Sequence, residues 1–312
     1  MKTTSLDRWI WDKHGLDTMD RKAVARFQLE KIQGLFDEAK MHSKWYRALY
    51  QDFETPATWE DFKCLPTISE RDLVERPHDF LCVNPKEIAR IVTLETSGTT
   101  EAPKRVFFTQ EDIHLTLDFF HHGMKTMCGA GDRALILFPA KTPDSVGALL
   151  STALTRLGLT VLASTVEEAP ALFSVHPFDL VCGPASWVVD AASLTKGMSV
   201  RSVLTSSELL DQSMRDRLKK WWGAEIFDHY GMTETGLGGA VECEAHQGMH
   251  IRENDLYFEI IGDKGELFAT TLTRRGMPFI RYRTGDRAVI TTERCPCGSQ
   301  IPRILSVRRQ SS

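Results

Sequence analysis

A hydroxyl-rich turn followed by cations is the first stretch of this sequence that could do chemistry. Residues 96–104 read TSGTTEAPK, with a glycine near the start and Lys104 at the end. Consecutive backbone N–H groups in a glycine-containing turn form a concave site for anions, and a lysine adds a point charge suited to phosphate. The Walker pattern is absent, because no glycine directly precedes the lysine. By itself the stretch fits either a phosphate-binding loop or an ordinary turn.

Two later stretches add aromatic rings and carboxylates. Residues 228–234 read DHYGMTE and follow an apolar run that is predicted to be a strand. An aromatic ring there could stack on a flat base, while a hydroxyl and a carboxylate could hold phosphate-bound magnesium, which prefers oxygen ligands. Residues 282–286 read YRTGD, and Asp286 could accept hydrogen bonds from two ribose hydroxyls. Taken singly, the first stretch could be a polar loop and the second a turn capped by aspartate.

Cysteines near the C-terminal end suggest a metal site. Cys243, His250, Cys295 and Cys297 offer three sulfurs and one imidazole, a set that zinc binds tetrahedrally in structural sites. The C-x-C spacing is less standard than C-x-x-C, so reduced cysteines without a metal are the alternative. His246 could replace His250 in the set. The other four cysteines, 64, 82, 128 and 182, are expected to be small buried apolar residues.

The elements that must position these residues are predicted by alternating apolar runs. Strands are expected at 133–138, 159–164, 178–183, 200–206 and 224–231, with helices at 145–158, 186–196 and 209–223 between them. This alternation is typical of an α/β protein whose parallel sheet is covered by helices on both faces, and ligands bind at the carboxyl ends of such strands. One long helix is expected over 20–50, where apolar residues recur at helical spacing.

The pattern changes near residue 240. Short antiparallel strands are expected at 255–261, 265–272 and 279–291. We therefore expect α/β nucleotide-binding subdomains over 1–240 and a small β-rich, barrel-like subdomain with the zinc site over 241–312. Phe138, Pro139 and Ala140 follow a predicted strand and could line a substrate pocket, whereas Phe119 and Phe120 are expected to pack in the core.

Composition excludes several classes of protein. The 312 residues are 42% hydrophobic and 26% charged with a net charge of -4, an ordinary globular mixture without the basic domain typical of nucleic-acid binding. No apolar run approaches the roughly 18 residues of a membrane span, and the N-terminus lacks the pattern of a signal peptide. We expect a cytoplasmic enzyme without nucleic-acid or membrane partners.

Together and in this order, the three chemical stretches resemble the adenylate-forming superfamily: acyl-CoA synthetases, peptide-synthetase adenylation domains and luciferases. TSGTTEAPK is similar to its phosphate loop, residues 206–236 to its adenine-binding segment, and YRTGD to its ribose motif. Four further segments resemble the phenylacetate-CoA ligase branch of this superfamily: SKWYRALY, WEDFKCLPTISERDL, ECEAHQGMHIRENDLYFEI and CPCGSQIPRI. Some members of that branch carry cysteines and a histidine at similar places, which supports the structural zinc. The resemblance covers roughly residues 40–310.

The resemblance implies a reaction and a role for each residue. A carboxylic acid, aromatic by analogy with the branch, would attack the α-phosphorus of ATP to form an acyl-adenylate, and CoA would then accept the acyl group. The catalytic residues would be Lys104, Thr233 on the α-phosphate and Glu234 on magnesium. Lys104 would hold the β- and γ-phosphates together with Ser97, Gly98, Thr99 and Thr100. Asp286 would hold the ribose, and the adenine would be surrounded by Ser207, Glu208, Asp228, His229 and Tyr230.

Some positions depart from the family pattern and leave alternatives open. Glu101 and Ser207 stand where the family often has glycine, and the chain reaches only the family's hinge, with Arg308 or Arg309 as the hinge arginine. The large N-terminal domain is therefore expected without the small C-terminal lid. An acyl carrier protein could replace CoA as acceptor, or the chain could bind nucleotide or acyl-adenylate without turnover. A zinc-ribbon interaction protein would explain the cysteines but not the other stretches. The oligomeric state is left open, with a dimer as one option.

Overall fold

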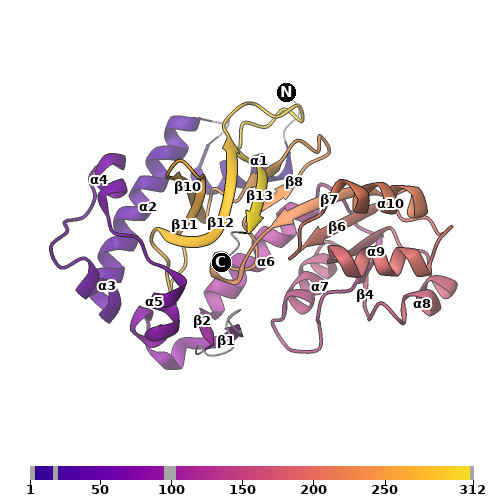
Figure 1. The fold of residues 1–312 in the computed structure, drawn as a ribbon, viewed down its shortest axis with the longest axis horizontal. Coiled ribbons are helices and arrows are strands. Elements are labelled where there is room, and N and C mark those ends of the chain that lie inside the picture. Colours follow the sequence, from indigo (N-terminus) through magenta and orange to yellow (C-terminus); the bar gives the residue numbers. More distant parts are fainter. Residues whose placement is uncertain (1–3, 17–19, 95–102, 310–312) are drawn as a thin grey trace.

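The computed structural model describes residues 4–16, 20–94 and 103–309. The N-terminal part of the chain consists of helices and a two-stranded antiparallel hairpin (Figure 1). These helices are α1 (Ser5–His14), α2 (Arg21–His42), α3 (Lys44–Leu49), α4 (Trp59–Cys64) and α5 (Glu70–Glu75), followed by 3-10 turns at Pro77–Phe80 and Pro85–Glu87. The hairpin consists of β1 (Ile88–Leu94) and β2 (Lys104–Thr109). The predicted phosphate loop connects its two strands, and Ser97, Gly98, Thr99, Thr100 and Glu101 lie outside the described residues.

The predicted alternation of strands and helices is confirmed in the middle of the chain. After α6 (Gln110–Met124) come β3 (Arg133–Ile136), α7 (Val146–Arg156), β4 (Thr160–Ala163), α8 (Ala169–Val175), β5 (Leu180–Pro184), α9 (Ala185–Leu194), β6 (Ser202–Ser206), α10 (Gln212–Trp222) and β7 (Glu225–Tyr230). Strands β4, β3, β5, β6 and β7 lie side by side in that order and are all parallel.

Helices cover both faces of this parallel sheet, as the apolar runs predict. Successive side chains of a strand point to opposite faces. In β3, Ala134 and Ile136 join the core cluster that contains α6 and α7, while Leu135 joins the cluster of α8, α9 and α10. The same division separates Phe227 from Ile226 in β7.

Antiparallel strands extend the sheet after β7. They are β8 (Ala240–Glu242), β9 (Met249–Ile251), β10 (Leu256–Ile261), β11 (Glu266–Thr271), β12 (Tyr282–Thr291) and β13 (Arg303–Arg309). The whole sheet has the order β10-β11-β12-β13-β9-β8-β7-β6-β5-β3-β4, so the antiparallel part continues from the parallel part through the pairing of β7 with β8. The three strands predicted after residue 240 correspond to β10, β11 and β12.

The prediction of one helix over 20–50 is wrong, because the first helix ends at His42 and a second begins after Ser43. Ser43 has extended backbone angles, and its hydroxyl accepts a hydrogen bond from the backbone N–H of Tyr46 while donating one to the carbonyl of Asp79. A buried serine that caps a new helix in this way competes with continuation of the previous one. The expectation for the scattered cysteines also fails in part, since Cys64 is exposed and only Cys182 of the four is buried. Among the described residues no helix is both long and apolar enough to cross a membrane.

Candidate active site

The carboxyl ends of β6 and β7 form one edge of the site. The two strands are parallel neighbours, with Thr205 opposite Asp228. The residues that follow them, Ser207 and the turn that contains Thr233, therefore emerge at the same edge of the sheet. Ser207 has a φ of +71°, in the left-handed region that favours glycine.

Glu234 lies in a buried cluster of charged and hydroxyl groups at this edge. Its side chain is 2% exposed, and Oε1 lies 2.5 Å from Nζ of Lys104. The same oxygen accepts a hydrogen bond of 3.1 Å from the Tyr282 hydroxyl. Nζ of Lys104 also lies 2.7 Å from Oε1 of Glu70. Burial alone would lower the pKa of Lys104, but the two carboxylates raise it, so the lysine stays charged.

Arg274 fixes the backbone of Glu234, a role that the sequence analysis missed. Its guanidinium is buried and donates 2.9 Å hydrogen bonds to the carbonyls of Glu234 and Phe107. The same group lies over the ring of Phe108, with its carbon 4.2 Å from the ring centroid. Because 40 residues separate Arg274 from Glu234, no local pattern in the sequence signals this contact.

Asp286 and Tyr230 meet beside this cluster, and their predicted roles at a nucleotide stay predictions. The Tyr230 hydroxyl donates a 2.9 Å hydrogen bond to Oδ2 of Asp286. Nη1 of Arg309 lies 3.3 Å from Oδ1 of the same carboxylate. Burial opposes the charge of Arg309, but Asp286 raises the pKa of the guanidinium. The three groups come from β7, β12 and β13, so the sheet places distant parts of the chain together.

An apolar cavity of about 160 Å³ opens at the Thr233 edge. Its walls include Phe119, Phe120 and Met124 from α6, Leu150 from α7, and Phe138 after β3. Ser206, Ser207 and Thr233 add hydroxyl groups to the lining. Phe138 lines this cavity, whereas Pro139 and Ala140, which were predicted together with it, do not belong to the lining. That the cavity binds substrate stays a prediction. The expected core residues Phe119 and Phe120 are buried but also form cavity wall, a role that helical spacing alone does not reveal.

His229 belongs to the lining of this cavity. Its Nδ1 lies 2.8 Å from the Ser206 hydroxyl, and its ring centroid lies 6.1 Å from that of Phe119 and 6.4 Å from that of Phe120. Burial, followed by the charge of Arg252, lowers the pKa of His229 to about 4, so the imidazole is neutral. The predicted place of His229 beside the adenine stays a prediction, but the observed surroundings are those of the apolar cavity.

Glu208 is held away from the cavity lining. Its two carboxylate oxygens accept hydrogen bonds from the backbone N–H and the hydroxyl of Ser186 at 2.7 and 3.0 Å. Ser186 lies in the first turn of α9, where the helix dipole favours a carboxylate. A role for Glu208 near adenine stays a prediction.

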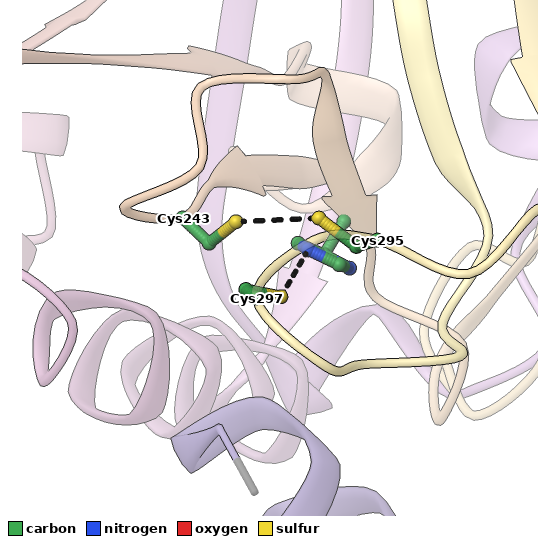
Figure 2. Close-up of side chains that lie close together, drawn as sticks. Cys243, Cys295 and Cys297 are labelled. Carbon is green, nitrogen blue, oxygen red and sulfur yellow. Dashed lines mark hydrogen bonds between the residues drawn. The ribbon is translucent and has the colours of Figure 1, made fainter. Parts of the chain in front are cut away.

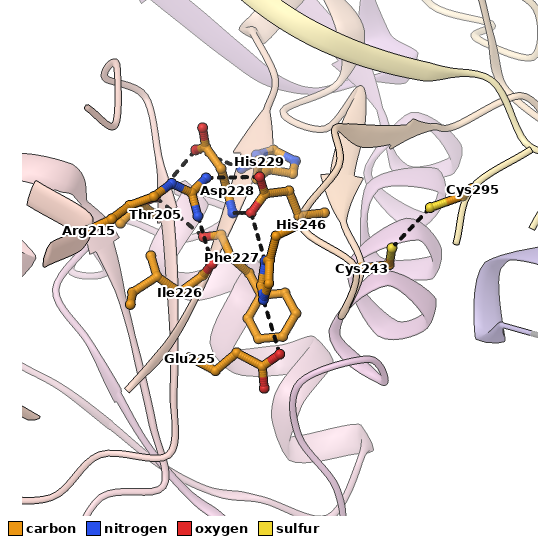
Figure 3. A network of polar contacts seen from close by, with 11 residues as sticks. Thr205, Arg215, Glu225, Ile226, Phe227, Asp228, His229, Cys243, His246 and Cys295 are labelled. Atoms are coloured by element: carbon orange, nitrogen blue, oxygen red, sulfur yellow. Dashed lines mark hydrogen bonds and ion pairs between the residues drawn. The ribbon is translucent and has the colours of Figure 1, made fainter. Parts of the chain in front are cut away.

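The Asp228 side chain lies on the face of β7 opposite to that of His229, in a polar network (Figure 3). Its backbone N–H donates to Glu242, which also pairs with Arg215 at 2.8 Å. Burial, followed by the negative charge of Glu242, raises the pKa of Asp228 to about 7. His246 joins the network through Glu225, at 3.0 Å, and Glu242, at 3.4 Å. His246 is therefore engaged by carboxylates and is not the imidazole of the cysteine cluster.

The four predicted zinc ligands converge in a buried cluster (Figure 2). The ligand atoms of Cys243, His250, Cys295 and Cys297 all lie within 4.8 Å of one another. Sγ of Cys243 lies 3.7 Å from Sγ of Cys295, and Sγ of Cys297 lies 3.5 Å from Nε2 of His250. A tetrahedral zinc with bonds of about 2.3 Å to sulfur separates its ligand atoms by about 3.8 Å, so the arrangement fits the ion.

Strand pairing explains why these ligands meet. Cys243 follows β8, and His250 lies in β9, which pairs with both β8 and β13. Cys295 and Cys297 lie in the connection from β12 to β13, and β13 pairs with β9, the strand that contains His250. The structure thus favours His250 over His246 in the set.

The chain is similar to known enzymes over most of its length. A family model described as AMP-binding enzyme matches residues 83–257, more than half of the chain. The curated relatives that match include proteins named phenylacetate-coenzyme A ligase. The one from Aromatoleum evansii is 30% identical over 311 residues, 88% of this chain and 68% of the relative. The one from Escherichia coli K12 is 28% identical and covers 92% of this chain and 68% of the relative.

A solved structure has the same fold. It is 2-hydroxyisobutyryl-CoA ligase in complex with 2-HIB-AMP and CoA, which matches with a TM-score of 0.80 at 21% identity over 92% of this chain and 68% of that chain. The fold, the family match and the converging motifs define an AMP-binding enzyme of the adenylate-forming class, and the chain belongs to that family. Within the family it is a phenylacetate-CoA ligase-like enzyme of the AMP-forming type. The predicted superfamily and branch are thereby confirmed.

Proposed function

We propose that the protein activates an aromatic carboxylic acid with ATP and passes the acyl group to CoA. The observation that carries this proposal is the apolar cavity of about 160 Å³ whose lining includes Thr233. Apolar protein cavities of about 150 Å³ accept a benzene ring, so the space suits an aryl group. An aryl group inside would leave the carboxylate of the acid at the strand edge where the nucleotide motifs converge. The names of the curated relatives support an aromatic acid as well.

The nucleotide would lie against the polar groups at the same edge. Asp286 would accept hydrogen bonds from the ribose hydroxyls, and Tyr230 would orient that carboxylate while its ring approaches the base. Thr233 would contact the α-phosphate. Lys104, with Ser97, Gly98, Thr99 and Thr100, would hold the outer phosphates. Glu234 would bind magnesium, which neutralises phosphate charge when it is present.

Two bond exchanges complete the reaction. In the first, one carboxylate oxygen bonds to the α-phosphorus while the bond from that phosphorus to the bridging oxygen breaks, which releases pyrophosphate. In the second, the thiol of CoA loses its proton to solvent, the resulting thiolate bonds to the acyl carbon, and the bond from that carbon to the phosphate oxygen breaks, which releases AMP. The protein contributes orientation and charge neutralisation rather than a covalent nucleophile.

We propose a structural zinc ion for the cluster of three cysteines and His250. All four ligand residues are buried, and the ion would join the β8–β9 turn to the β12–β13 connection. We also propose that the chain divides near residue 240 into an α/β part and a β-rich part, because the sheet changes there from parallel to antiparallel strands.

Detection of the products tests the proposed function. The protein is incubated with magnesium-ATP, CoA and either an aromatic or a short aliphatic acid, and the products are identified by mass spectrometry. We expect AMP and an aryl-CoA with at least one aromatic acid. Formation of aliphatic thioesters alone would contradict the assigned substrate class. A thioester on an acyl carrier protein but none on CoA would contradict the assigned acceptor.

A further inference from the structure

The proposed acid cavity contains a buried ring nitrogen that lacks a partner. Nε2 of His229 makes no hydrogen bond within the part of the chain that the structure describes, although the atom is buried. The other ring nitrogen, Nδ1, is held by the Ser206 hydroxyl at 2.8 Å. The imidazole is therefore fixed at one side and unsatisfied at the other. Buried polar atoms in folded proteins nearly always have a partner, so this atom requires an explanation.

The neighbours of the ring include apolar and small groups, and the charged side chain of Arg252 also acts on it. Phe119 and Phe120 pack near the imidazole, and Gly231 and Gly238 lie beside it. A Cβ on Gly231 would come within 2.7 Å of Cε1 of the imidazole, and one on Gly238 within 3.4 Å of Nε2. The backbones of the two glycines therefore lie close to this edge of the ring, and neither position has room for a side chain. Since His229 lines the cavity, a ligand bound there is the natural source of the missing hydrogen bond.

The neutral imidazole can offer either a donor or an acceptor at Nε2. A neutral histidine carries one N–H, and the other nitrogen accepts. The Ser206 hydroxyl can donate to Nδ1 or accept from it, so it is compatible with both tautomers. A hydroxyl group on the ligand matches both states, because it also donates and accepts. A charged group would have to lose its hydration among phenylalanine side chains, which is costly.

We propose that His229 selects an aromatic acid that carries a hydroxyl group on its ring, with that hydroxyl hydrogen-bonded to Nε2. This inference rests on the proposed function and names the substrate class more closely. A ring without the hydroxyl would fill the same space but leave Nε2 unpaired. Sites that hydrogen-bond a substrate hydroxyl discriminate strongly against the analogue that lacks it, because their polar group then stays buried and unsatisfied.

Matched acids and two variants of His229 test the proposal. Phenylacetic acid and benzoic acid are each compared with their three ring-hydroxylated isomers, by kcat/KM for the carboxylate-dependent exchange of pyrophosphate into ATP. We expect at least one hydroxylated acid to exceed its parent by roughly 10- to 100-fold. In His229→Ile, which presents no polar atom, that ratio should fall to near one or invert. In His229→Gln, which keeps a donor and an acceptor, a preference for the hydroxylated acid should remain.

Controls separate this proposal from folding defects and from the proposed function. His176→Gln changes a histidine at the end of α8, away from the cavity lining, and should leave the ratio unchanged. Melting temperatures show whether each variant is folded. Calorimetric binding of the same acids reads the preference without turnover. If the protein binds the hydroxylated acid more tightly than its parent but catalyses no exchange of pyrophosphate with any acid, the proposed function is contradicted and the role of His229 is not.

Two results would overturn the role of His229. One is a parent acid that is used and bound at least as well as every hydroxylated isomer. The other is a hydroxyl preference that persists unchanged in folded His229→Ile.

Discussion

Glu234 presents its carboxylate to Lys104 and Tyr282 at the strand edge, where the proposed magnesium-ATP would bind. The variant Glu234→Gln keeps the size of the side chain and removes its charge. We expect magnesium-ATP to bind roughly 10-fold or more weakly, because hydrogen bonds and ionic contacts to a charged group contribute more than neutral ones. Isothermal titration with magnesium-ATP measures the change.

The matched control for this prediction is Glu70→Gln. Glu70 also contacts Lys104, but its side chain is 44% exposed, against 2% for Glu234. Its loss should change the affinity less. Equal affinity of wild type and Glu234→Gln for magnesium-ATP would refute the metal role of Glu234.

Asp228 should make stability depend on pH. Burial and Glu242 raise its pKa from 3.8 to about 7 in the folded protein. Between these values the folded state binds more protons than the unfolded state, so stability falls as pH rises through this range. Asp228→Asn lacks the titrating group and keeps a side-chain oxygen that can accept from Thr205 and from the backbone N–H of His229.

Melting temperatures at pH 5 and pH 8 test this dependence. The variant should gain stability relative to wild type at the higher pH, by an amount on the order of a few degrees. A difference between the two proteins that is the same at both pH values would show that Asp228 does not retain its proton in the folded state.

At the scale of elements, the turn after β6 carries strain. Ser207 has a φ of +71°, which costs a non-glycine residue about 1–2 kcal/mol. Ser207→Gly removes that cost but adds freedom to the unfolded chain, so a net gain of about 0.5–1 kcal/mol is expected. Urea denaturation measures the free energy of unfolding.

Ser202→Gly is the matched control for the turn. Ser202 begins the same strand, is buried and does not have a positive φ, so glycine should destabilise the protein there. A loss of stability in Ser207→Gly similar to that of the control would contradict the assigned strain.

The cysteine cluster should behave as a structural element that depends on metal. Zinc contributes its binding free energy to folding, so Cys297→Ser or removal of zinc by a chelator should lower the melting temperature. Cys64→Ser is the matched control, because Cys64 is exposed and lies outside the cluster. Metal analysis of protein purified without added zinc should give about one equivalent per chain. The zinc proposal would be contradicted if the purified protein contained no zinc and the Cys297→Ser variant were as stable as Cys64→Ser.

Much of the fold could be predicted because the central strands are short apolar runs with helices between them. The runs at 133–138, 159–164, 178–183, 200–206 and 224–231 correspond to β3, β4, β5, β6 and β7. In contrast, β8 and β9 have only three residues each, too few to show a period, and they were not predicted. The break between α2 and α3 was missed because it depends on the contact of Ser43 with Asp79, far along the chain.

The site could be predicted only where residues lie in recognisable motifs. The motifs identified four residues that meet in pairs in the structure. Lys104 forms an ion pair with Glu234, and Tyr230 donates a hydrogen bond to Asp286. Arg274 and the cavity walls on α6 were missed, since their roles arise from packing between segments distant in sequence. Whether Phe119 is core or cavity wall depends on empty space beside it, which a sequence pattern does not encode.

At the scale of the whole molecule, one continuous sheet organises the proposed chemistry. The sheet carries the parts of the chain that contain Ser207, Thr233 and Asp286, and the hairpin of β1 and β2 supplies Lys104 (Figure 1). Arg309, at the end of β13, contacts Asp286 and so connects the last described strand to the site. The chain matches about two thirds of the length of its curated relatives. The central question is therefore whether the site on this chain forms an acyl-adenylate.

The most direct test is the exchange of labelled pyrophosphate into ATP, measured with this chain, magnesium and single carboxylic acids. The acyl-adenylate step is reversible, so an enzyme that forms the adenylate incorporates label only when its acid is present. We predict exchange above the no-acid control with an aromatic acid and its loss in Glu234→Gln. Binding of magnesium-ATP without acid-dependent exchange, for every aromatic acid tested, would contradict the claim that this chain activates an acid.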